Sequence, residues 1–600
     1  MPQGPLNLQT LLEVPYVEWD YGFDISPDSQ QVAFSWNLSG RWEIYLAPLD
    51  GSQPPKPVTA GSGAKFTPRW SWDGQRLLYV LDEDGGELFD LYVYDLNSGT
   101  HTNLTPDTPE AIQPEPCWSP DGAQVAFISD RSSRFETYVK SLAGGEARKV
   151  LDVSYPHYKL AWSPDGRWLV TVTLGEGQDF YTYIVPLDGG EPFAIAGSQG
   201  PVCAKDVAWS PDSKFLAFSS DLPGEYNIGL FELENRQLKW LTAGAGDKEF
   251  PAWAPDGQKL VYVAGDGPQN SLALLDLSSG ETVTYQVAPG IHYRPHFTPD
   301  GRQVLFAFDN PSRPADLWAL SFPDGAFRQL TYSLPTGLKK ARFALPEEVA
   351  YASLDGRQVP ALLYRPPKTK GLPPAVVYIH GGPNWITQIT WDPLVQHMVS
   401  RGWVVVAPNY RGSIGFGREW QLASRFDLGG GETLDVVAAA DYLAQQGIAD
   451  PPRIAVTGRS HGGYLTMTSL TRFPDRWAGG SAVVPFLNWF TGHENCREDL
   501  QHWDLENFGD PVKDYKRYYE RSPLFFLDRV AAPVQLVCGA HDPRCPVSES
   551  VQARNALRSL GKPCDFVLYP DEGHVFLKIE NIVDAKQRQV DFLAQVLNAA

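Results

Sequence analysis

The feature that most constrains the fold of this chain is a short pattern that recurs seven times in its first half. Each copy is a turn related to Ser-Pro-Asp-Gly, and its aspartates are Asp28, Asp73, Asp121, Asp165, Asp212, Asp256 and Asp300. Successive aspartates lie 44 to 48 residues apart. Short apolar runs, such as 125–128 and 216–218, follow the turns and leave room for four strands per repeat. Repeats of this length and content are typical of β-propeller blades.

The turn chemistry accounts for the repeated aspartates without giving them a catalytic role. In Ser-Pro-Asp-Gly, proline sets φ, aspartate caps the turn and glycine accepts the left-handed conformation. We therefore predict structural roles for these carboxylates. The prediction for residues 17–338 is a seven-bladed β-propeller.

The ends of the repeat predict how the ring closes. The first blade opens with a strand at 23–26 and the seventh ends near 328–331, so no strand is left over for exchange between the two ends. We expect a ring closed by packing alone. Residues 1–16 fall outside the ring. Four leucines in this extension predict a short helix that packs on the second domain: Leu6, Leu8, Leu11 and Leu12.

From about residue 339 the pattern changes to strands that alternate with longer helices, which indicates an α/β domain over residues 339–600. The predicted strands are 375–379, 404–408, 453–457, 480–484, 534–538 and 566–569, and the predicted helices are 432–446, 464–472, 548–560 and 580–597. The strands are mostly continuous apolar runs, as expected of parallel strands that are buried on both faces.

Ser460 is the candidate nucleophile of this second domain. It lies in Gly458-Arg459-Ser460-His461-Gly462, between an apolar run and a predicted helix. Strand, tight turn and helix in this order form the nucleophile elbow of an α/β-hydrolase. Glycine is needed beside the serine because it has no Cβ to clash in the turn. A glycine-rich turn without chemistry is the alternative explanation.

Two later strand ends carry the partners that a serine nucleophile requires, a base and a carboxylate that orients it. Asp542 follows the run 534–538, and His574 follows the run 566–569. The order Ser, Asp, His is that of α/β-hydrolases. We therefore predict Asp542 as the orienting acid and His574 as the general base.

Three neighbours compete for these roles. His541 adjoins the predicted acid on the same strand end, so it is poorly placed to reach the serine. Asp571 and Glu572 share the loop of the predicted base, which leaves less room for a bridging geometry.

The oxyanion hole requires two main-chain donors. We predict the N–H of His461, the residue after the nucleophile, as the first donor. The second is expected from 378–383, where a strand runs into glycines. We select Gly382 there, with Gly381 as the alternative donor.

Composition restricts the classes of binding partner and the cellular location that we expect. The net charge of −21 argues against nucleic acid or an anionic membrane surface, since both require basic patches. The first residues lack the basic and apolar regions of a signal peptide, and no apolar run is long enough to span a bilayer, so we expect a cytoplasmic protein. The six cysteines show no C-x-x-C spacing, so we expect free thiols, although the sequence leaves open a bridge among Cys538, Cys545 and Cys564. We predict no metal site, because Pro295 between His292 and His296 argues against a helix that presents both on one face.

A seven-bladed propeller followed by such a hydrolase domain resembles the prolyl oligopeptidase family of serine peptidases. The segments 380–383, 409–417 and 458–463, together with Gly573-His574, are similar to the acylaminoacyl-peptidase branch. The resemblance covers nearly the whole chain. It implies hydrolysis of short peptides through an acyl-enzyme, no cofactor, and a propeller that restricts access to a cavity between the domains.

The resemblance also implies substrate-binding residues. Arg544 matches an arginine that holds a substrate carbonyl, and the next position, commonly a valine that lines S1, is Cys545 here. The P1 preference is therefore open. We expect contributions from Val547 and from Phe486 and Trp489, although aromatic residues are equally common in cores. Strictly prolyl-specific members place a tyrosine hydroxyl in the oxyanion hole, and the glycine segment of this chain argues against that specificity.

We predict a serine peptidase of the acylaminoacyl-peptidase or aminopeptidase/oligopeptidase type that acts on short peptides, and a homo-oligomer is one assembly that the family allows. An esterase or small-amide hydrolase with the same triad is the first alternative, because the fold supports many acyl transfers. A propeller interaction module with an inactive hydrolase domain is the alternative from another class. The presence of all the predicted triad and oxyanion residues disfavours it.

Overall fold

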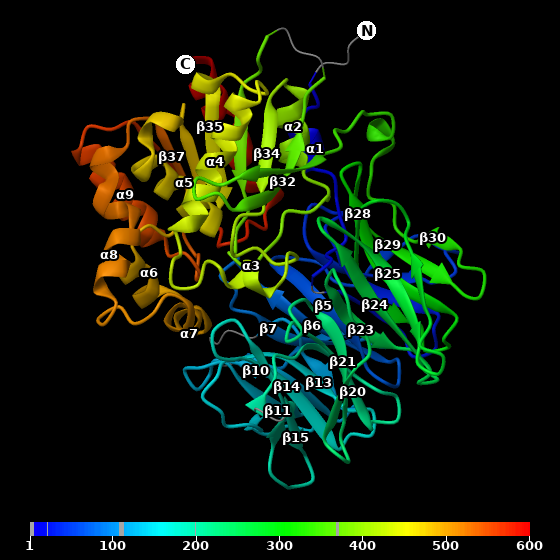
Figure 1. Cartoon of the computed structure of the whole chain (residues 1–600). Helices are drawn as coiled ribbons and strands as arrows, with labels where there is room; N and C mark the ends of the chain where they lie inside the picture. The colour runs from blue at the N-terminus through cyan, green and yellow to red at the C-terminus, as the bar shows by residue number, and fades with distance from the viewer. Residues whose placement is uncertain (1–4, 21, 107–112, 198–199, 368–370, 600) are drawn as a thin grey trace. The chain divides into compact units, whose positions relative to one another are not determined.

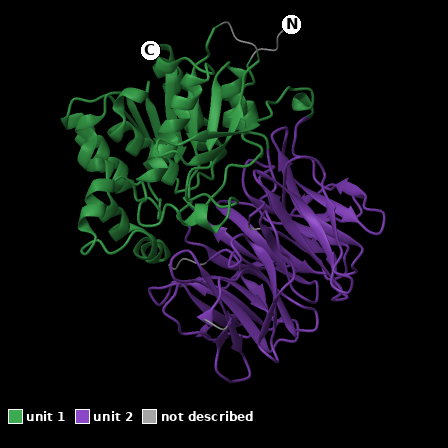
Figure 2. Cartoon of the chain, viewed as in Figure 1, with its two compact units in different colours: residues 1–14, 84–86, 336–600 green, residues 15–83, 87–335 purple. Residues whose placement is uncertain are grey.

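The computed structural model describes residues 5–20, 22–106, 113–197, 200–367 and 371–599. The chain separates into two compact units (Figure 2): residues 15–83 and 87–335 form one, and residues 1–14, 84–86 and 336–600 form the other.

The first unit is a seven-bladed β-propeller, as predicted, and each blade is a four-stranded antiparallel sheet (Figure 1). The blades are β1–β4 (Phe23–Ile25, Gln31–Trp36, Glu43–Pro48, Lys56–Pro57), β5–β8 (Ala64–Trp70, Arg76–Asp82, Asp90–Asp95, Thr100–Asn103), β9–β12 (Cys117–Trp118, Gln124–Ser129, Glu136–Ser141, Arg148–Lys149), β13–β16 (His157–Trp162, Trp168–Leu174, Phe180–Pro186, Phe193–Ala194), β19–β22 (Lys205–Trp209, Phe215–Ser220, Asn227–Glu232, Gln237–Trp240), β23–β26 (Lys248–Trp253, Lys259–Asp266, Gln269–Asp276, Thr282–Tyr285) and β27–β30 (Ile291–Phe297, Gln303–Asn310, Arg313–Ser321, Phe327–Gln329). A small hairpin, β17 (Ala196–Gly197) and β18 (Gly200–Pro201), separates the fourth and fifth blades in the sequence.

The repeated aspartates lie in the turns between the first two strands of their blades. The Ser119 hydroxyl donates to Asp121 Oδ1 at 2.5 Å, and the same oxygen accepts the N–H of Ala123 at 3.0 Å. The fourth blade repeats the contact, with 2.6 Å from Ser163 Oγ to Asp165 Oδ1. These contacts account for the aspartates as turn residues.

The ring closes by hydrogen bonds as well as by packing. Every blade consists of consecutive strands, so among the described residues no strand is exchanged between the ends of the ring. The N–H of Val17 donates to the carbonyl of Ala315 on β29 at 2.9 Å, and Val17 also pairs with Trp36 on β2. The prediction of closure by packing alone is therefore incomplete, because a segment before the first blade joins it to the last.

The second unit is built on an eight-stranded sheet with the order β31-β32-β34-β33-β35-β36-β37-β38. The strands are β31 (Glu347–Ala352), β32 (Gln358–Tyr364), β33 (Ala375–Ile379), β34 (Val404–Pro408), β35 (Ile454–Arg459), β36 (Gly480–Val483), β37 (Val534–Gly539) and β38 (Cys564–Tyr569). Strands β33 to β38 are parallel, whereas β31 and β32 add an antiparallel edge. The six predicted strands are the six parallel ones.

Helices cover both faces of this sheet. They are α1 (Leu8–Leu12), α2 (Pro393–Ser400), α3 (Arg418–Leu422), α4 (Gly431–Gln445), α5 (His461–Arg472), α6 (Trp489–Asn495), α7 (Glu498–Asn507), α8 (Tyr515–Arg521), α9 (Val547–Ser559) and α10 (Ile579–Ala599), with 3₁₀ turns at Thr336–Leu338, Pro451–Arg453, Pro474–Arg476 and Pro523–Arg529. The side chains of α4, α5 and α9 pack in one buried cluster, and those of α1, α2 and α10 pack in another.

The parallel strands supply both clusters in alternation. Val377 and Val406 belong to the cluster of α4 and α5, whereas Val376 and Val405 belong to that of α2 and α10. Successive side chains of a strand point to opposite faces, so a strand covered on both sides is apolar throughout. In the N-terminal extension, Leu8 of α1 joins the second cluster, and the N–H of Leu6 donates to Ser400 Oγ at 2.9 Å.

Candidate active site

Ser460 lies in the turn between β35 and α5. Its φ of 59° and ψ of −123° place it in a conformation that non-glycine residues rarely adopt. Its N–H donates to the carbonyl of Val483, at the end of β36, at 2.9 Å. The side chain is thereby placed at the carboxyl ends of the parallel strands, where α/β folds bind ligands.

The glycines around Ser460 are required by close main-chain approaches. A Cβ added to Gly458 would lie 2.5 Å from the carbonyl oxygen of Gly462. One added to Gly462 would meet the carbonyl oxygens of Ile379 and His380, the second at 2.7 Å. Since real Cβ atoms do not approach oxygen this closely, both positions admit only glycine without a shift of the main chain.

Asp542 and His574 form a buried pair. His574 Nδ1 lies 2.8 Å from Asp542 Oδ2. The other carboxylate oxygen, Oδ1, accepts the N–H of Arg544 at 2.9 Å and that of Cys545 at 2.8 Å. Because the carboxylate only accepts, His574 Nδ1 carries the proton, which leaves Nε2 as a base.

Burial lowers the pKa of His574 below its ordinary value, and the Asp542 carboxylate opposes this shift without cancelling it. The imidazole is therefore neutral at pH 7, as a general base must be. The loop of His574 is held as well, because the Arg459 guanidinium donates to its carbonyl oxygen at 2.6 Å.

The three competing residues have other contacts. His541 Nδ1 lies 3.1 Å from Asp84 Oδ2. Asp571 pairs with Lys578, and Glu572 accepts main-chain N–H groups from the segment that follows its own loop. These contacts explain the positions of His541, Asp571 and Glu572 without a catalytic role.

The glycine segment after β33 lies against the nucleophile. A Cβ added to Gly381 would be 3.3 Å from Ser460 Cβ. The Gly381 carbonyl accepts from His380 Nδ1 at 2.7 Å and from the Tyr410 hydroxyl at 3.3 Å. In the trans peptide between Gly381 and Gly382, the N–H of Gly382 points in the direction opposite to the Gly381 carbonyl. This arrangement favours Gly382 over Gly381 as the second donor.

The thiol of Cys545 lies near the Ser460 hydroxyl. Burial, followed by the nearby Asp542 carboxylate, raises the pKa of this thiol well above its ordinary value, and the Ser460 hydroxyl only partly opposes the rise. The thiol is therefore neutral, and a neutral thiol is a weak donor and a weak acceptor. Cys545 thus lies beside the candidate nucleophile without competing with it as a thiolate.

The remaining predicted substrate residues differ in exposure. Phe486, Arg544 and Val547 are half-buried. Trp489 is only 3% exposed, its ring stacks on Phe508 with a centroid separation of 3.9 Å, and its Nε1 donates to the Tyr464 hydroxyl at 3.0 Å. Trp489 thus packs in the core, which is the alternative that its aromatic character left open.

Three residues that hold the site together were not among the predicted site residues. Tyr410 holds the Gly381 carbonyl, and Glu432 lies 3.1 Å from the ring of His461. Glu549, which is fully buried on α9, accepts the N–H groups of Leu487 and Asn488. Tyr410 lies in a motif that carries the family resemblance, whereas the two glutamates lie in the first turns of α4 and α9 and have no local sequence signal.

One group among the described residues has the composition of a metal site. Asp179, Cys203 and Asp221, all in the propeller, offer ligand atoms that lie within 4.8 Å of one another. All six cysteines are free. Burial, followed by the two carboxylates, raises the pKa of Cys203 well above its ordinary value, so a metal there would have to displace a proton.

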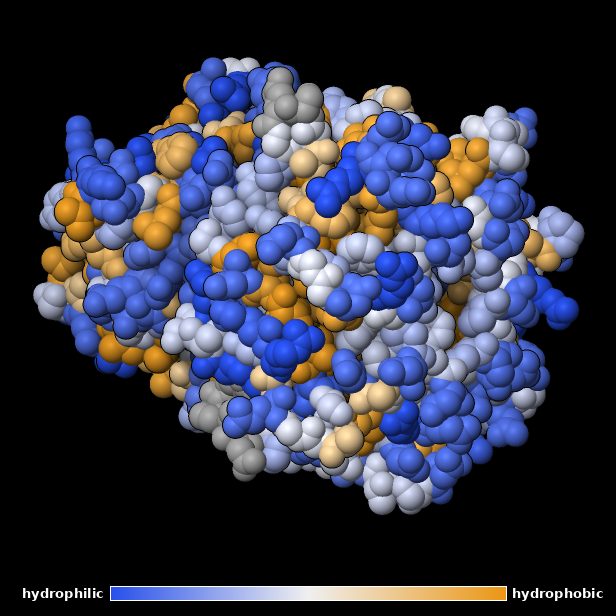
Figure 3. Space-filling view, turned by 90° about the horizontal axis from the view of Figure 1, so that it is seen from below, coloured by the Kyte–Doolittle hydropathy of each residue, from blue (hydrophilic) through white to orange (hydrophobic). Residues whose placement is uncertain are grey.

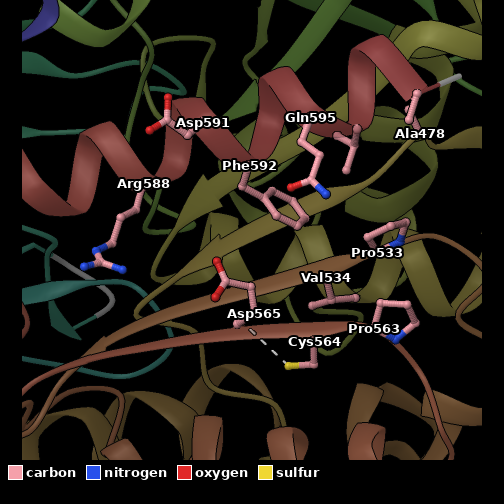
Figure 4. Close-up of a pocket in the computed structure, with 12 residues that line it drawn as sticks. Ala478, Pro533, Val534, Pro563, Cys564, Asp565, Arg588, Asp591, Phe592 and Gln595 are labelled. Atoms are coloured by element: carbon pink, nitrogen blue, oxygen red, sulfur yellow. Dashed lines mark hydrogen bonds between the residues drawn. The ribbon is translucent and has the colours of Figure 1, made fainter.

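A cavity of about 930 Å³ lies at the other end of the sheet from Ser460, Asp542 and His574. Figure 4 shows Phe592 and Gln595 of α10 on one side of it and Val534 and Cys564 on the other. The last two residues begin β37 and β38, whereas Asp542 and His574 follow the ends of these strands. The cavity is therefore separate from the site of Ser460.

The surface is mainly hydrophilic. Hydrophilic residues cover most of the face drawn in Figure 3, with smaller apolar areas between them. In the part of the chain that the structure describes, no helix has the length and apolar character needed to cross a membrane.

Comparisons with known proteins extend over both units. Residues 390–600 match the prolyl oligopeptidase family, and residues 23–184 and 175–347 match the TolB β-propeller domain. The chain is 27% identical to the uncharacterized peptidase YuxL of Bacillus subtilis, over 84% of this chain and 93% of that protein. It is 26% identical to dipeptidyl aminopeptidase BIII of Pseudoxanthomonas mexicana, over 96% of this chain and 86% of that protein.

Solved structures share the fold. A puromycin-hydrolyzing peptidase of Mycobacterium tuberculosis superposes with a TM-score of 0.87 at 22% identity, over 99% of this chain and 96% of that one. At this identity the likeness concerns the fold, and the family rests on the sequence matches. These matches confirm the family that the motifs indicated: residues 390–600 form a domain of the prolyl oligopeptidase family of serine peptidases.

Proposed function

We propose that Ser460, His574 and Asp542 are the catalytic triad of this peptidase and that the N–H groups of His461 and Gly382 form its oxyanion hole. The observation that carries the proposal is the buried pair of His574 Nδ1 and Asp542 Oδ2, 2.8 Å apart, at the same sheet edge as the elbow of Ser460. The Asp542 carboxylate is buried and is itself held by two main-chain N–H groups. Such an arrangement is not expected around an ordinary surface histidine, so it favours a catalytic pair.

The proposed reaction proceeds through an acyl-enzyme. Ser460 Oγ attacks the peptide carbonyl carbon while His574 Nε2 takes its proton, and the carbonyl oxygen becomes an oxyanion. When the carbon–nitrogen bond breaks, the protonated imidazole gives its proton to the leaving amine. Water then repeats the attack with the same base, and the serine is released with the carboxylic acid product. Asp542 keeps the imidazole in the required tautomer throughout.

We propose short peptides with an apolar P1 residue as substrates. The half-buried Phe486 and the buried Cys545 beside the nucleophile support an apolar P1. One relative is named a dipeptidyl aminopeptidase, and one structural neighbour is described as a puromycin-hydrolyzing peptidase. The names support small substrates, and the first supports recognition of the substrate's N-terminus. A limit on substrate size by the propeller rests on the family resemblance alone. The cytoplasmic location, the homo-oligomer and the three-part domain boundaries stay predictions.

The first test is the variant Ser460→Ala. We expect kcat to fall by at least about 10³-fold with an unchanged melting temperature, because only the nucleophile is lost. A fluorophosphonate probe should label the wild-type chain and not the variant. The control is Ser559→Ala, an exposed serine near the end of α9, which should keep full activity. Activity retained by Ser460→Ala, or wild-type protein that is folded but unlabelled, would refute the assignment.

The second test compares four chromogenic substrates that share one apolar P1 residue: a free-amino, an N-acetylated, a dipeptidyl and a simple ester compound. A clear preference for one peptide series supports the peptidase and identifies how the N-terminus is read. A higher kcat/KM for the ester than for every peptide would favour the esterase alternative. No turnover and no labelling would favour an inactive hydrolase domain.

A further inference from the structure

Glu432 is a buried carboxylate in contact with the residue that follows the nucleophile. It is the second residue of α4 and has no exposed surface. Its Oε1 lies 3.1 Å from Nε2 of His461, whose side chain is 2% exposed. The two residues are 29 positions apart in the sequence. The contact therefore links the start of α4 to the start of α5.

The carboxylate is held at both oxygens. Its Oε2 accepts the N–H of Gly429 at 2.6 Å, while Oε1 faces His461. Since the ionised carboxylate only accepts, His461 Nε2 must be the donor in this contact. One end of the imidazole is thus directed at a fixed acceptor on another helix.

Aromatic rings surround the same imidazole. The centroid of the His461 ring lies 5.3 Å from that of Tyr464, 6.0 Å from that of Phe486 and 6.2 Å from that of Tyr410. Tyr410 in turn stacks on His380 at 4.3 Å and holds the carbonyl of Gly381. The rings therefore connect the two segments that supply the oxyanion donors.

A purely structural role gives a poor account of Glu432. Burying a carboxylate costs free energy, and an apolar side chain would fill such a position at lower cost. The two hydrogen bonds compensate for burial only in the geometry that also fixes the His461 ring. His461 begins α5, so fixing its ring also limits the direction of its main-chain N–H.

We propose that Glu432 is a positioning residue for the oxyanion hole: through the imidazole of His461, it aims the main-chain N–H of His461 at the developing oxyanion. The inference rests on the proposed function, because it presupposes Ser460 as the nucleophile and the His461 N–H as a donor. It adds a residue from α4 to a site otherwise formed by strand ends.

Two variants of Glu432 test the proposal. Glu432→Gln leaves one acceptor oxygen for two donors, and Glu432→Ala leaves none. Complete loss of an oxyanion donor costs about 10²–10³-fold in kcat, and a misdirected donor should cost less. We expect kcat to fall about tenfold for Glu432→Gln and about 50-fold for Glu432→Ala, with KM within about twofold of wild type.

The matched control is Thr433→Val, on the next residue of the same helix. Thr433 is also fully buried, and its hydroxyl bonds the Gly429 carbonyl at 2.8 Å and Thr468 Oγ1 at 2.8 Å. The variant loses local hydrogen bonds without touching His461. It should lower the melting temperature while kcat stays within about twofold of wild type.

Two readouts separate positioning from mere stability. A peptidyl boronic acid places a tetrahedral oxygen in the oxyanion hole, so its affinity should fall by the same factor as kcat, whereas the affinity of the matching product peptide should not change. In a double-variant cycle, Glu432→Ala and His461→Ala should be non-additive, because the first acts through the second.

The outcomes are distinguishable. An active wild type and an inactive Ser460→Ala, together with Glu432 variants of unchanged kcat, would overturn this inference and leave the proposed function intact. So would equal losses of boronate and product affinity, or additive effects in the cycle. An active Ser460→Ala would instead overturn the proposed function itself.

Discussion

The environment of His574 sets the pH range in which the proposed base works. Burial lowers the pKa of this histidine below its ordinary value of 6.5, and Asp542 only partly opposes the shift. The base must be neutral, so activity is lost as pH falls through the lowered pKa. We expect the acid limb of kcat/KM to lie below pH 6.5, as measured with an uncharged substrate. An acid limb above that value would contradict the prediction.

The same histidine predicts the effect of Asp542→Asn. Asp542 is the group that raises the pKa of His574, so its neutralisation should move the acid limb to still lower pH. The rate should also fall by about 10⁴-fold, the size of effect known for the corresponding change in the Ser-His-Asp template, because the wrong tautomer is favoured. Unchanged melting behaviour would show that the loss is chemical. A limb that moves upward would refute the electrostatic account.

Cys545 offers a second test at the scale of one residue. Its thiol lies near the Ser460 hydroxyl, which must donate to His574 in the proposed attack. Cys545→Val removes the thiol as an alternative partner for this hydroxyl and nearly conserves volume, so we expect labelling by a fluorophosphonate to accelerate about two- to fivefold. Cys564→Val, at the start of β38, makes the same change at the other end of the sheet and should have no effect. Unchanged or slower labelling of Cys545→Val would contradict the prediction.

At the scale of elements, the elbow depends on the approach of β33 to the start of α5. A Cβ on Gly462 would collide with the carbonyl oxygens of Ile379 and His380. We expect Gly462→Ala to lower both activity and melting temperature, since relief requires moving the strand that leads to the oxyanion segment. The same change at Gly337, which has open space around its Cβ position, should be silent. Equal behaviour of the two variants, by activity assay and thermal melting, would exclude this explanation.

At the scale of the whole molecule, charged residues tie blades of the propeller to one another. Glu115, before β9, lies 3.0 Å from Arg294 on β27 and 3.7 Å from Lys159 on β13. Burial alone would raise the pKa of Glu115, but Lys159, Arg294 and Arg69 together outweigh it and lower the pKa to about 2. Because the pKa is depressed, this contribution to stability is present above pH 4.5 and is lost as pH falls toward 2.

Glu115→Gln should therefore destabilise the propeller by about 1–3 kcal/mol, since two partly buried cations each lose one of their acidic partners and keep only Asp20 or Asp206. Scanning calorimetry at pH 7 should show the transition of the propeller at a lower temperature. Glu146→Gln, at an exposed position, is the control and should leave the transition unchanged. The difference between Glu115→Gln and wild type should shrink on acidification, and a constant difference down to pH 2 would contradict the linkage.

The sequence by itself determined the architecture and the order of the three residues that we propose as catalytic. Repeated turns are local sequence signals, and their number and spacing predict the number of blades without any knowledge of tertiary contacts. The six parallel strands were predicted because burial on both faces makes them continuously apolar. Ser460, Asp542 and His574 could be found because each follows such a strand, and parallel strands end at one edge of the sheet.

Only the tertiary structure decided which residues hold that site. Glu432 and His461 are 29 positions apart, and Tyr410 reaches a carbonyl 29 positions before it. The antiparallel strands β31 and β32 and the main-chain bonds of Val17 were likewise absent from the prediction, and the sequence could not decide between a core and a substrate-binding position for Trp489. Such contacts leave no periodic or compositional trace, because they depend on which buried polar groups meet after the chain has folded.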